Sequence, residues 1–117
     1  MDENSIRRIQ PHSKVAEQSV IGAMLMDRDV ISDIADMLSR EDFYNAQYGV
    51  LYETMVELYN EGKPVDMVTL HDRLTTKDIP EEISSVAFIG DIIQAVPTSA
   101  NAKEYAQIVL DKSTLRR

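Results

Sequence analysis

The acidic side chains are the first candidates for chemistry in this sequence, because several recur at the spacing of one helical face. Asp33 and Asp36 form one pair, and Glu53, Glu57 and Glu61 form a longer series. General acid–base catalysis needs two carboxyl groups in a water-excluded cleft that pushes their pKa values apart. These carboxylates instead alternate with apolar residues, which is typical of the solvated faces of amphipathic helices. We interpret them as surface charge.

The other reactive residue types do not form a recognisable site. His12 and His71 lie in different segments, and neither Glu-x-x-His nor His-Glu-x-x-His occurs. The chain has no cysteine, which excludes disulfides and thiolate sites. Its four glycines form neither a phosphate-binding loop nor a dinucleotide fingerprint, and no serine lies in a nucleophile elbow. The sequence predicts a non-enzymatic chain with no catalytic residue, no metal and no cofactor.

Composition points to a soluble domain that does not bind DNA strongly. The net charge is −8, from 20 acidic and 12 basic residues. Nucleic-acid affinity depends on neutralising phosphates with Lys and Arg, so we expect no strong direct DNA binding. The acidity either keeps the domain dissolved or attracts a basic protein partner. No apolar run approaches the roughly 20 residues of a membrane span, and no signal-peptide stretch follows the start. We expect a cytoplasmic location and no membrane partner.

The elements that position these residues are predicted to be helices. Apolar residues recur at three- and four-residue spacing in about six segments, and no segment alternates apolar and polar residues as a half-buried strand would. The stripes cover residues 20–25, 30–38, 48–59, 67–74, 89–96 and 102–109, the last extending toward Leu115. The predicted fold class is all-α, a compact multi-helix orthogonal bundle with short connections.

Cap and turn residues predict where these helices begin and end. Asp27, Asn45 and Asp66 are expected N-caps, and Gly62 is expected to end the third helix in the left-handed conformation. Gly22 lies within the first stripe, where a small residue lets another helix approach closely. In the second half we expect a loop at 78–82, a helix start at Ser84 or Ser85, a stop at Pro97 and a last helix starting at Thr98 or Ser99.

The end of the sequence shows no helix stop. No Gly, Asn or Pro occurs from Tyr105 to Arg117, although helices usually close with a cap. Either the basic residues of the last turn complement the helix dipole at a natural terminus, or the helix continues into a longer protein. We expect the second. The opening stretch, residues 1–13, is expected to be a flexible arm.

The aromatic residues are the main candidates for binding. Tyr48, Tyr52 and Tyr59 share one helical face and fit core packing, interface anchoring or stacking on single-stranded bases. Stacking usually requires a basic groove, which is not evident here. Phe88 follows the acidic pair Glu81 and Glu82, and an apolar residue beside carboxylates suits docking of a basic helix. Core packing is the alternative for Phe88.

Four groups of residues, taken in order, resemble the N-terminal domain of DnaB-type replicative helicases. They are PHS at 11–13 with AEQSVIGAML at 16–25, EDFY at 41–44, GKPVDMVTL at 62–70, and VPTSANA at 96–102 followed by YAQIV at 105–109 and KSTLRR at 112–117. No single string is specific, but their order and spacing make the resemblance strong from Pro11 to the end. Two departures are Lys14-Val15, where the family usually has an apolar-acidic pair, and Ser84-Ser85, where it usually has two glycines.

The resemblance implies a place in a larger assembly. Such helicases are hexameric rings in which ATP and magnesium bind a C-terminal RecA-like domain, which this chain lacks. Their N-terminal domains form a collar, a trimer of dimers, that recruits the C-terminal domain of a DnaG-type primase at the replication fork. By this resemblance, residues 14–97 are the globular head and 98–117 begin the collar hairpin. A helicase loader is a further candidate partner.

Two sets of candidate contact residues follow. Glu81, Glu82 and Phe88 are the candidates for facing primase. The candidates for contacts between helicase subunits are Tyr105, Ile108, Val109 and Leu115. The competing hypothesis is a helical module that contacts nucleic acid, which tight, strongly salt-dependent binding to single-stranded DNA would support.

Overall fold

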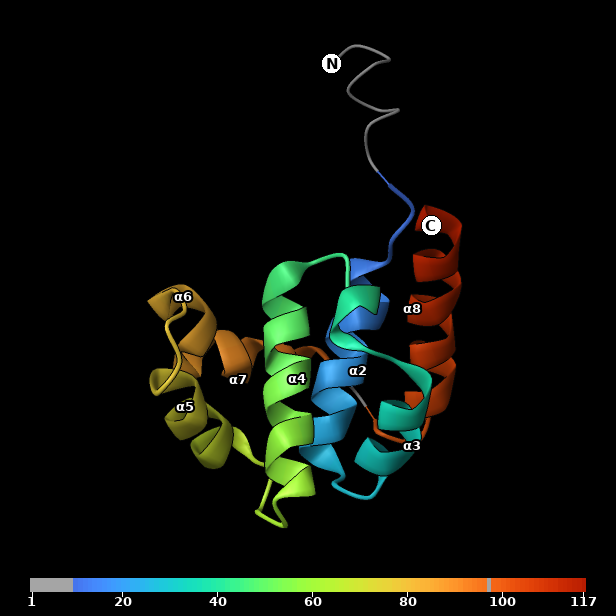
Figure 1. The fold of residues 1–117 in the computed structure, drawn as a ribbon. Helices are drawn as coiled ribbons and strands as arrows, with labels where there is room; N and C mark the ends of the chain where they lie inside the picture. The colour runs from blue at the N-terminus through green and yellow to red at the C-terminus, as the bar shows by residue number, and fades with distance from the viewer. Residues whose placement is uncertain (1–9, 97) are drawn as a thin grey trace.

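The structure, a computed structural model, describes residues 10–96 and 98–117 (Figure 1). Residues 1–9 of the flexible arm expected at 1–13, and the expected stop at Pro97, lie outside the described residues. The elements are α2 (Lys14–Met26), α3 (Val30–Met37), the 3₁₀ turn η1 (Arg40–Asp42), α4 (Ala46–Asn60), α5 (Met67–Thr75), α6 (Glu81–Ser84), α7 (Val86–Ala95) and α8 (Ala102–Arg116). The described residues contain no strand, which confirms the all-α prediction.

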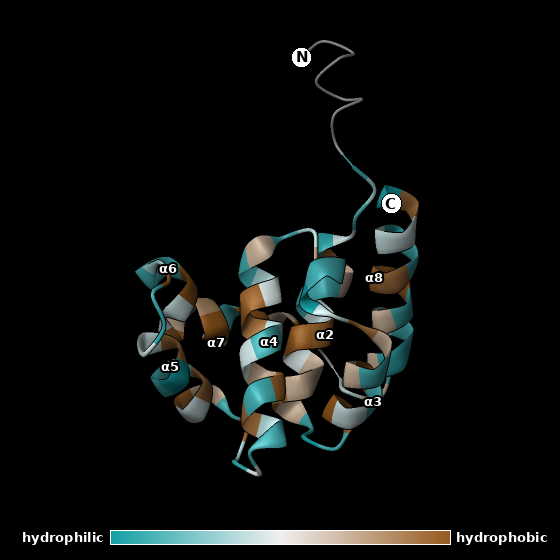
Figure 2. Ribbon diagram, viewed as in Figure 1, coloured by the Kyte–Doolittle hydropathy of each residue, from teal (hydrophilic) through white to brown (hydrophobic). Residues whose placement is uncertain are grey.

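Helix α2 lies at the centre of the fold. It packs against α8 and α7 most extensively and also against α4 and α3. Val20, Ile21 and Met24 on α2 are fully buried, so the predicted apolar stripe is its core-facing side. Hydrophobic and hydrophilic residues share the surface of α4, as an amphipathic helix requires (Figure 2). Burial of α2 on several sides leaves the other helices to carry most of the solvated surface.

Gly22 allows α7 to pack closely on α2. A Cβ atom at this position would lie 2.3 Å from Val96 Cγ2 and 3.4 Å from the carbonyl oxygen of Ile92. The first distance is far shorter than a normal carbon–carbon contact of about 3.5–4.0 Å. The predicted close helix approach at Gly22 is therefore confirmed, and α7 is the helix that makes it.

Two tyrosines of α4 belong to the core, and the third lies at its edge. Tyr48 and Tyr52 are each 3% exposed, and the Tyr52 hydroxyl donates to the Leu38 carbonyl oxygen at 2.7 Å. Burial raises the pKa of Tyr52 to about 12. Tyr59 is half-buried beneath the Arg28 guanidinium, which lies 4.5 Å from its ring centroid. The core interpretation therefore holds for Tyr48 and Tyr52.

Some predicted caps are confirmed. The Asp66 carboxylate accepts the Thr69 amide hydrogen at 2.9 Å and completes a capping box. Gly62 has a φ of 74°, the left-handed conformation expected after α4. The Ser85 hydroxyl accepts the Phe88 amide hydrogen at the start of α7. Asn45 precedes α4 as predicted, but its side chain makes no capping bond and donates instead to Glu17.

Three boundaries were predicted wrongly. Asp27 closes α2, and its carboxylate accepts the Asp29 amide hydrogen in a short turn, so α3 begins two residues later than expected. The predicted loop at 78–82 ends early because Glu81 begins the short α6, which raises the number of α-helices from about six to seven in the described residues. The N-cap of α8 is Asn101, because residues 98–100 form a turn that Thr98 stabilises through the Ala100 amide.

Helix α8 packs along α2 and α3 and contributes to the same core. Its inward side consists of Ala102, Ala106, Val109 and Ser113, all buried. These positions follow a four-three-four spacing, so they form one continuous stripe on the helix. Residues 102–113 thus pack into the same core as α2 and α3.

Candidate protein-binding site

The start of α7 and the short α6 form an exposed surface of mixed character. Glu81 and Glu82 occupy the first turn of α6 and are both exposed. Val86, in the first turn of α7, is 48% exposed. We name these residues, together with Phe88, the α6–α7 surface. It combines carboxylates with apolar side chains, and its role in binding stays a prediction.

Phe88 connects this surface with the core. Its side chain is half-buried and lies parallel to the Tyr48 ring, with centroids 6.0 Å apart and an interplanar angle of 10°. Ile89 and Ile92 on the same helix are buried and hold α7 in place. The core-packing alternative for Phe88 is therefore met in part, and its docking role stays a prediction.

A hollow of about 480 Å³ adjoins the α6–α7 surface, and its walls include His71, Leu74, Ile79 and Val86. His71 Nδ1 lies 2.6 Å from the carbonyl oxygen of Ser84. A carbonyl oxygen can only accept a hydrogen bond, so Nδ1 carries the proton here. His71 thereby connects α5 to the end of α6. Among the described residues no group of three or more His, Cys, Asp or Glu side chains is placed to hold a metal.

The four candidates for subunit contacts divide between two sides of α8. Ile108 is 42% exposed and Leu115 is 66% exposed, whereas Tyr105 is half-buried. Val109 is 1% exposed and belongs to the core. Tyr105, Ile108 and Leu115 lie at three- and seven-residue spacings, which places them on one face of the helix. That outer face is the one that another helix could contact.

The acidic series on α4 is balanced by basic residues. Arg40 NH1 lies 3.0 Å from Glu53 Oε1, and Lys77 Nζ lies 3.0 Å from Glu57 Oε2. Glu61 pairs with Arg73 of α5 at 2.7 Å. Hydrogen bonds from Arg73 and Lys63 lower the pKa of Glu61 to about 2. These exposed and half-exposed pairs agree with the prediction that the carboxylates form a solvated surface.

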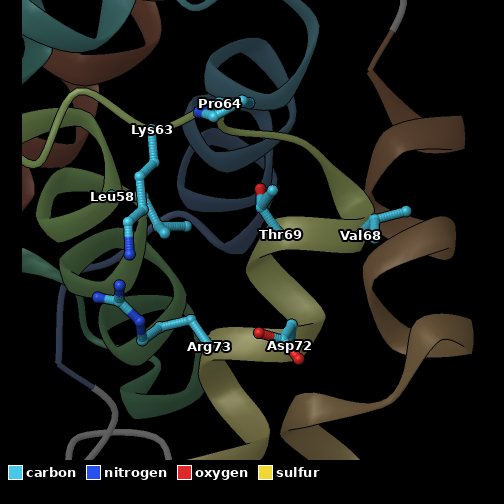
Figure 3. Close-up of a pocket in the computed structure, with 7 residues that line it drawn as sticks. All are labelled: Leu58, Lys63, Pro64, Val68, Thr69, Asp72 and Arg73. Carbon is cyan, nitrogen blue, oxygen red and sulfur yellow. The ribbon is translucent and has the colours of Figure 1, made fainter.

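A second hollow of about 300 Å³ lies between the end of α4 and α5 (Figure 3). Figure 3 shows the cationic ends of Lys63 and Arg73 close together, and both approach Glu61 Oε1, at 3.2 and 2.7 Å. Leu58, Pro64 and Val68 provide apolar walls. Glu61 pairs with both cations, Glu57 lies 3.8 Å from Arg73, and Asp72 also lines the hollow. The hollow therefore offers little net positive charge for binding a phosphate group.

Two buried carboxylates were not identified from the sequence. Glu17 is 1% exposed, and its oxygens accept the amide hydrogens of Tyr44 and Asn45 at 2.9 and 3.0 Å. Glu17 thus caps α4 from α2. A signal was present, because Glu17 precedes Val20 and Ile21 by one helical turn on the apolar stripe. Asp42, at the end of η1, is 3% exposed.

The first departure from the family pattern is exposed. Lys14 lies at the surface, and Val15 is 74% exposed at the start of α2.

Within the described part of the chain, no helix is both long and apolar enough to span a membrane.

The fold defines the class of this protein: a small all-α domain in which a central helix is surrounded by the others. A family model described as the DnaB-like helicase N terminal domain matches residues 9–111. The chain belongs to this family.

Bacterial relatives of the chain include replicative DNA helicases that are much longer than the chain itself. The chain is 39% identical over 117 residues to a replicative DNA helicase DnaB of Geobacillus stearothermophilus, with 100% of the chain and 26% of the relative covered. It is 37% identical over 110 residues to a replicative DNA helicase DnaC of Bacillus subtilis, with 94% and 24% covered. The chain therefore spans about a quarter of the length of these relatives.

Solved structures share the fold. The crystal structure of the N-terminal domain of DnaB helicase from Mycobacterium tuberculosis matches with a TM-score of 0.88 and 37% identity, covering 92% of this chain and 75% of that one. The N-terminal domain of DnaB helicase from Helicobacter pylori matches with a TM-score of 0.70 and 22% identity, covering 97% and 86%. At the lower identity the likeness establishes the fold alone.

Proposed function

We propose that this chain is a non-catalytic protein-binding domain of a replicative DNA helicase, which supports assembly of the helicase ring and recruits primase. Membership of the DnaB-like N-terminal family carries the proposal. In this proposal ATP hydrolysis, with its magnesium, belongs to another part of the whole protein, since the chain corresponds to a quarter of its relatives. The proposed order along the chain is an arm at 1–13, a globular head at 14–97, and the start of a collar hairpin at 98–117.

Primase is proposed to bind the α6–α7 surface. The exposed Glu81 and Glu82 would attract a basic helix, and Val86 and Phe88 would contact its apolar side. An apolar centre with charges at its rim is the usual anatomy of a protein interface. The Helicobacter pylori domain of the same fold was described together with its interactions with primase.

Calorimetric titration with the C-terminal domain of the cognate DnaG-type primase tests this proposal. We expect weak binding by this chain, because part of the interface is proposed to arise only in the assembled collar. The pair Glu81→Lys with Glu82→Lys should lower the association constant at least tenfold, because rim carboxylates steer a basic partner. Glu104→Lys, a single exposed charge reversal on α8, serves as a control for charge reversal outside this surface.

Two results would contradict the proposed primase site. One is an unchanged association constant in the double variant, and the other is an equal loss in Glu104→Lys. Phe88→Ala is a further test, and near-ultraviolet circular dichroism must accompany it because Phe88 also stacks on Tyr48. The expected loss of binding should exceed that from Val68→Ala, which truncates a 75% exposed side chain elsewhere.

Subunit contacts are proposed to use the outer face of α8. Ile108 and Leu115 are its most exposed apolar residues, with Tyr105 beside them, whereas Val109 contributes through core packing. We expect sedimentation equilibrium of the chain to give a monomer or a weak dimer, and Ile108→Asp with Leu115→Asp to shift any dimer to monomer. A stable hexamer formed by this chain alone would contradict the proposal.

Nucleic-acid binding is the competing function. Its test is a titration with single-stranded DNA at low and moderate salt. We expect weak binding at both, because a chain of net charge −8 neutralises few phosphates. Tight binding that falls steeply with salt would replace the present proposal. A helicase loader remains a proposed additional partner, without an assigned surface.

A further inference from the structure

Asp42 binds the last turn of α8 although the two lie far apart in the sequence. The Asp42 side chain is buried, and its Oδ1 accepts hydrogen bonds from the Ser113 hydroxyl at 2.6 Å and from Arg117 NH2 at 2.7 Å. Its Oδ2 accepts the Ser39 amide hydrogen at 2.8 Å. The carboxylate is therefore shared between η1, where it closes a capping box, and α8.

Arg116 extends the same contact to the N-terminal segment. Its NH2 group donates to the Asp42 carbonyl oxygen and its NH1 group to the Pro11 carbonyl oxygen, each at 2.8 Å. The guanidinium carbon also lies 5.5 Å from the centroid of the Tyr44 ring. His12 stacks on that ring, with centroids 3.9 Å apart. Figure 1 shows the first described residues passing beside the C-terminal end of α8.

We propose that Asp42, Ser113, Arg116 and Arg117 form a clasp that couples the last turn of α8 to residues 10–12, so that both are released together. The physical reason is the position of Arg116. Its guanidinium reaches Pro11 and Tyr44 only while the last turn of α8 is seated, and the bonds to Asp42 seat that turn. Unseating the turn removes the hydrogen bond to Pro11. It also removes the cation–π contact with Tyr44, the ring on which His12 stacks.

Ser113 is the most selective position at which to open the clasp. Removing Asp42 itself would also break the η1 capping box. The Arg117 side chain is 65% exposed, so its ion pair is a weaker contributor than a buried one. The Ser113 hydroxyl is buried and bonds a carboxylate, which makes it one of the stronger hydrogen bonds. Ser113→Ala removes that bond with little change in volume.

Nuclear magnetic resonance of the 117-residue chain tests the coupling. We expect Ser113→Ala to raise the amide exchange rates in the last turn of α8 about tenfold, the loss expected for one charge-assisted hydrogen bond. The His12 ring protons, shifted by the stacked Tyr44 ring, should move toward their unstacked positions although Ser113 does not touch them. Thr114→Ala is the matched control, because this hydroxyl donates only to the Leu110 carbonyl oxygen of its own helix.

The reverse experiment follows from the reciprocity of coupling. Tyr44→Ala removes the ring that contacts both His12 and Arg116, so the last turn of α8 should exchange faster. The inference is overturned if Ser113→Ala leaves the His12 resonances in place, or if Thr114→Ala gives the same effects. A uniform rise in exchange across α2–α8 would also contradict it, because a clasp opens locally.

Discussion

Replacing Gly22 by alanine tests the closest helix contact of the fold. Alanine favours a helix interior over glycine by about 1 kcal/mol. At Gly22, however, the added methyl group would lie 2.3 Å from Val96 Cγ2 and 2.9 Å from Val96 Cβ. Val96 is 5% exposed and its neighbour Ile92 is 1% exposed, so the Val96 side chain has little room to turn away.

The two effects can be weighed against each other. Overpacking a close contact costs about 1–3 kcal/mol, and the overlap here exceeds 1 Å relative to an ordinary carbon–carbon contact of about 3.5 Å. The upper part of that range therefore applies, and subtracting the helix preference of about 1 kcal/mol leaves a net loss of about 1–2 kcal/mol. With a urea m-value near 1.5 kcal/mol per molar, the unfolding midpoint should fall by about 1 M.

Urea unfolding followed by far-ultraviolet circular dichroism measures this change. Gly90→Ala is the matched control, because Gly90 lies within α7 and an added methyl would have only Met67 Cε within reach, at 4.0 Å. We expect this second variant to be more stable than the parent by up to about 1 kcal/mol. The two glycine replacements should thus have opposite signs.

A double variant isolates the contact. Val96→Ala removes Cγ2, so Gly22→Ala should cost at least about 1 kcal/mol less in that background than in the parent. If Gly22→Ala stabilised the domain as Gly90→Ala does, the close approach of α2 and α7 would be wrong. Additive effects of Gly22→Ala and Val96→Ala would show that the two side chains do not meet.

Three further predictions concern single residues. Glu17→Gln should lower the free energy of unfolding by about 2–4 kcal/mol, because it replaces one buried acceptor of the Tyr44 and Asn45 amide hydrogens by a donor. A loss below about 1 kcal/mol in urea unfolding would exclude this capping role. Although burial alone would raise it, hydrogen bonds from Ser113 and Ser39 and the charge of Arg117 lower the pKa of Asp42 below 3.8. Its stabilisation should therefore be complete above about pH 5, where the carboxylate is ionised in the unfolded chain as well, and disappear as the pH falls through the lowered pKa. The difference in unfolding free energy between the parent and Asp42→Asn should accordingly narrow below about pH 5, and a difference independent of pH would contradict this. Gly62→Ala should lower the free energy of unfolding by about 1 kcal/mol, because a φ of 74° is strained for a residue with a Cβ atom. An unchanged urea unfolding midpoint would contradict this backbone strain.

Much of the local structure could be predicted from the sequence, because it depends on neighbours along the chain. The apolar spacing predicted the helices, and Asp66 and Gly62 predicted the beginning of α5 and the end of α4. The errors arose where two local signals compete. Asp27 has the chemistry of an N-cap, but its side chain stabilises the turn that follows α2. Pro80 predicted a loop, whereas it immediately precedes the short helix α6.

The candidate binding residues were predicted less completely, because exposure depends on the whole fold. Glu81 and Glu82 are exposed on α6, whereas Phe88 on α7 is half-buried against Tyr48. The stripe on α8 was read as one set, whereas packing against α2 and α3 buries Val109 and leaves Ile108 and Leu115 outside. When a helix has apolar residues on two faces, its sequence does not predict which face will be buried in the core.

The sequence by itself determined the all-helical class, the solvated role of the α4 carboxylates and the family to which the chain belongs. Each depends on residue types and spacings along the chain. Only the tertiary structure decided the roles of Glu17 and Asp42, because their partners come from segments that are distant in sequence. A carboxylate is ordinarily a surface residue, and what makes it a buried cap or a clasp is a set of donors that folding alone brings within hydrogen-bonding distance.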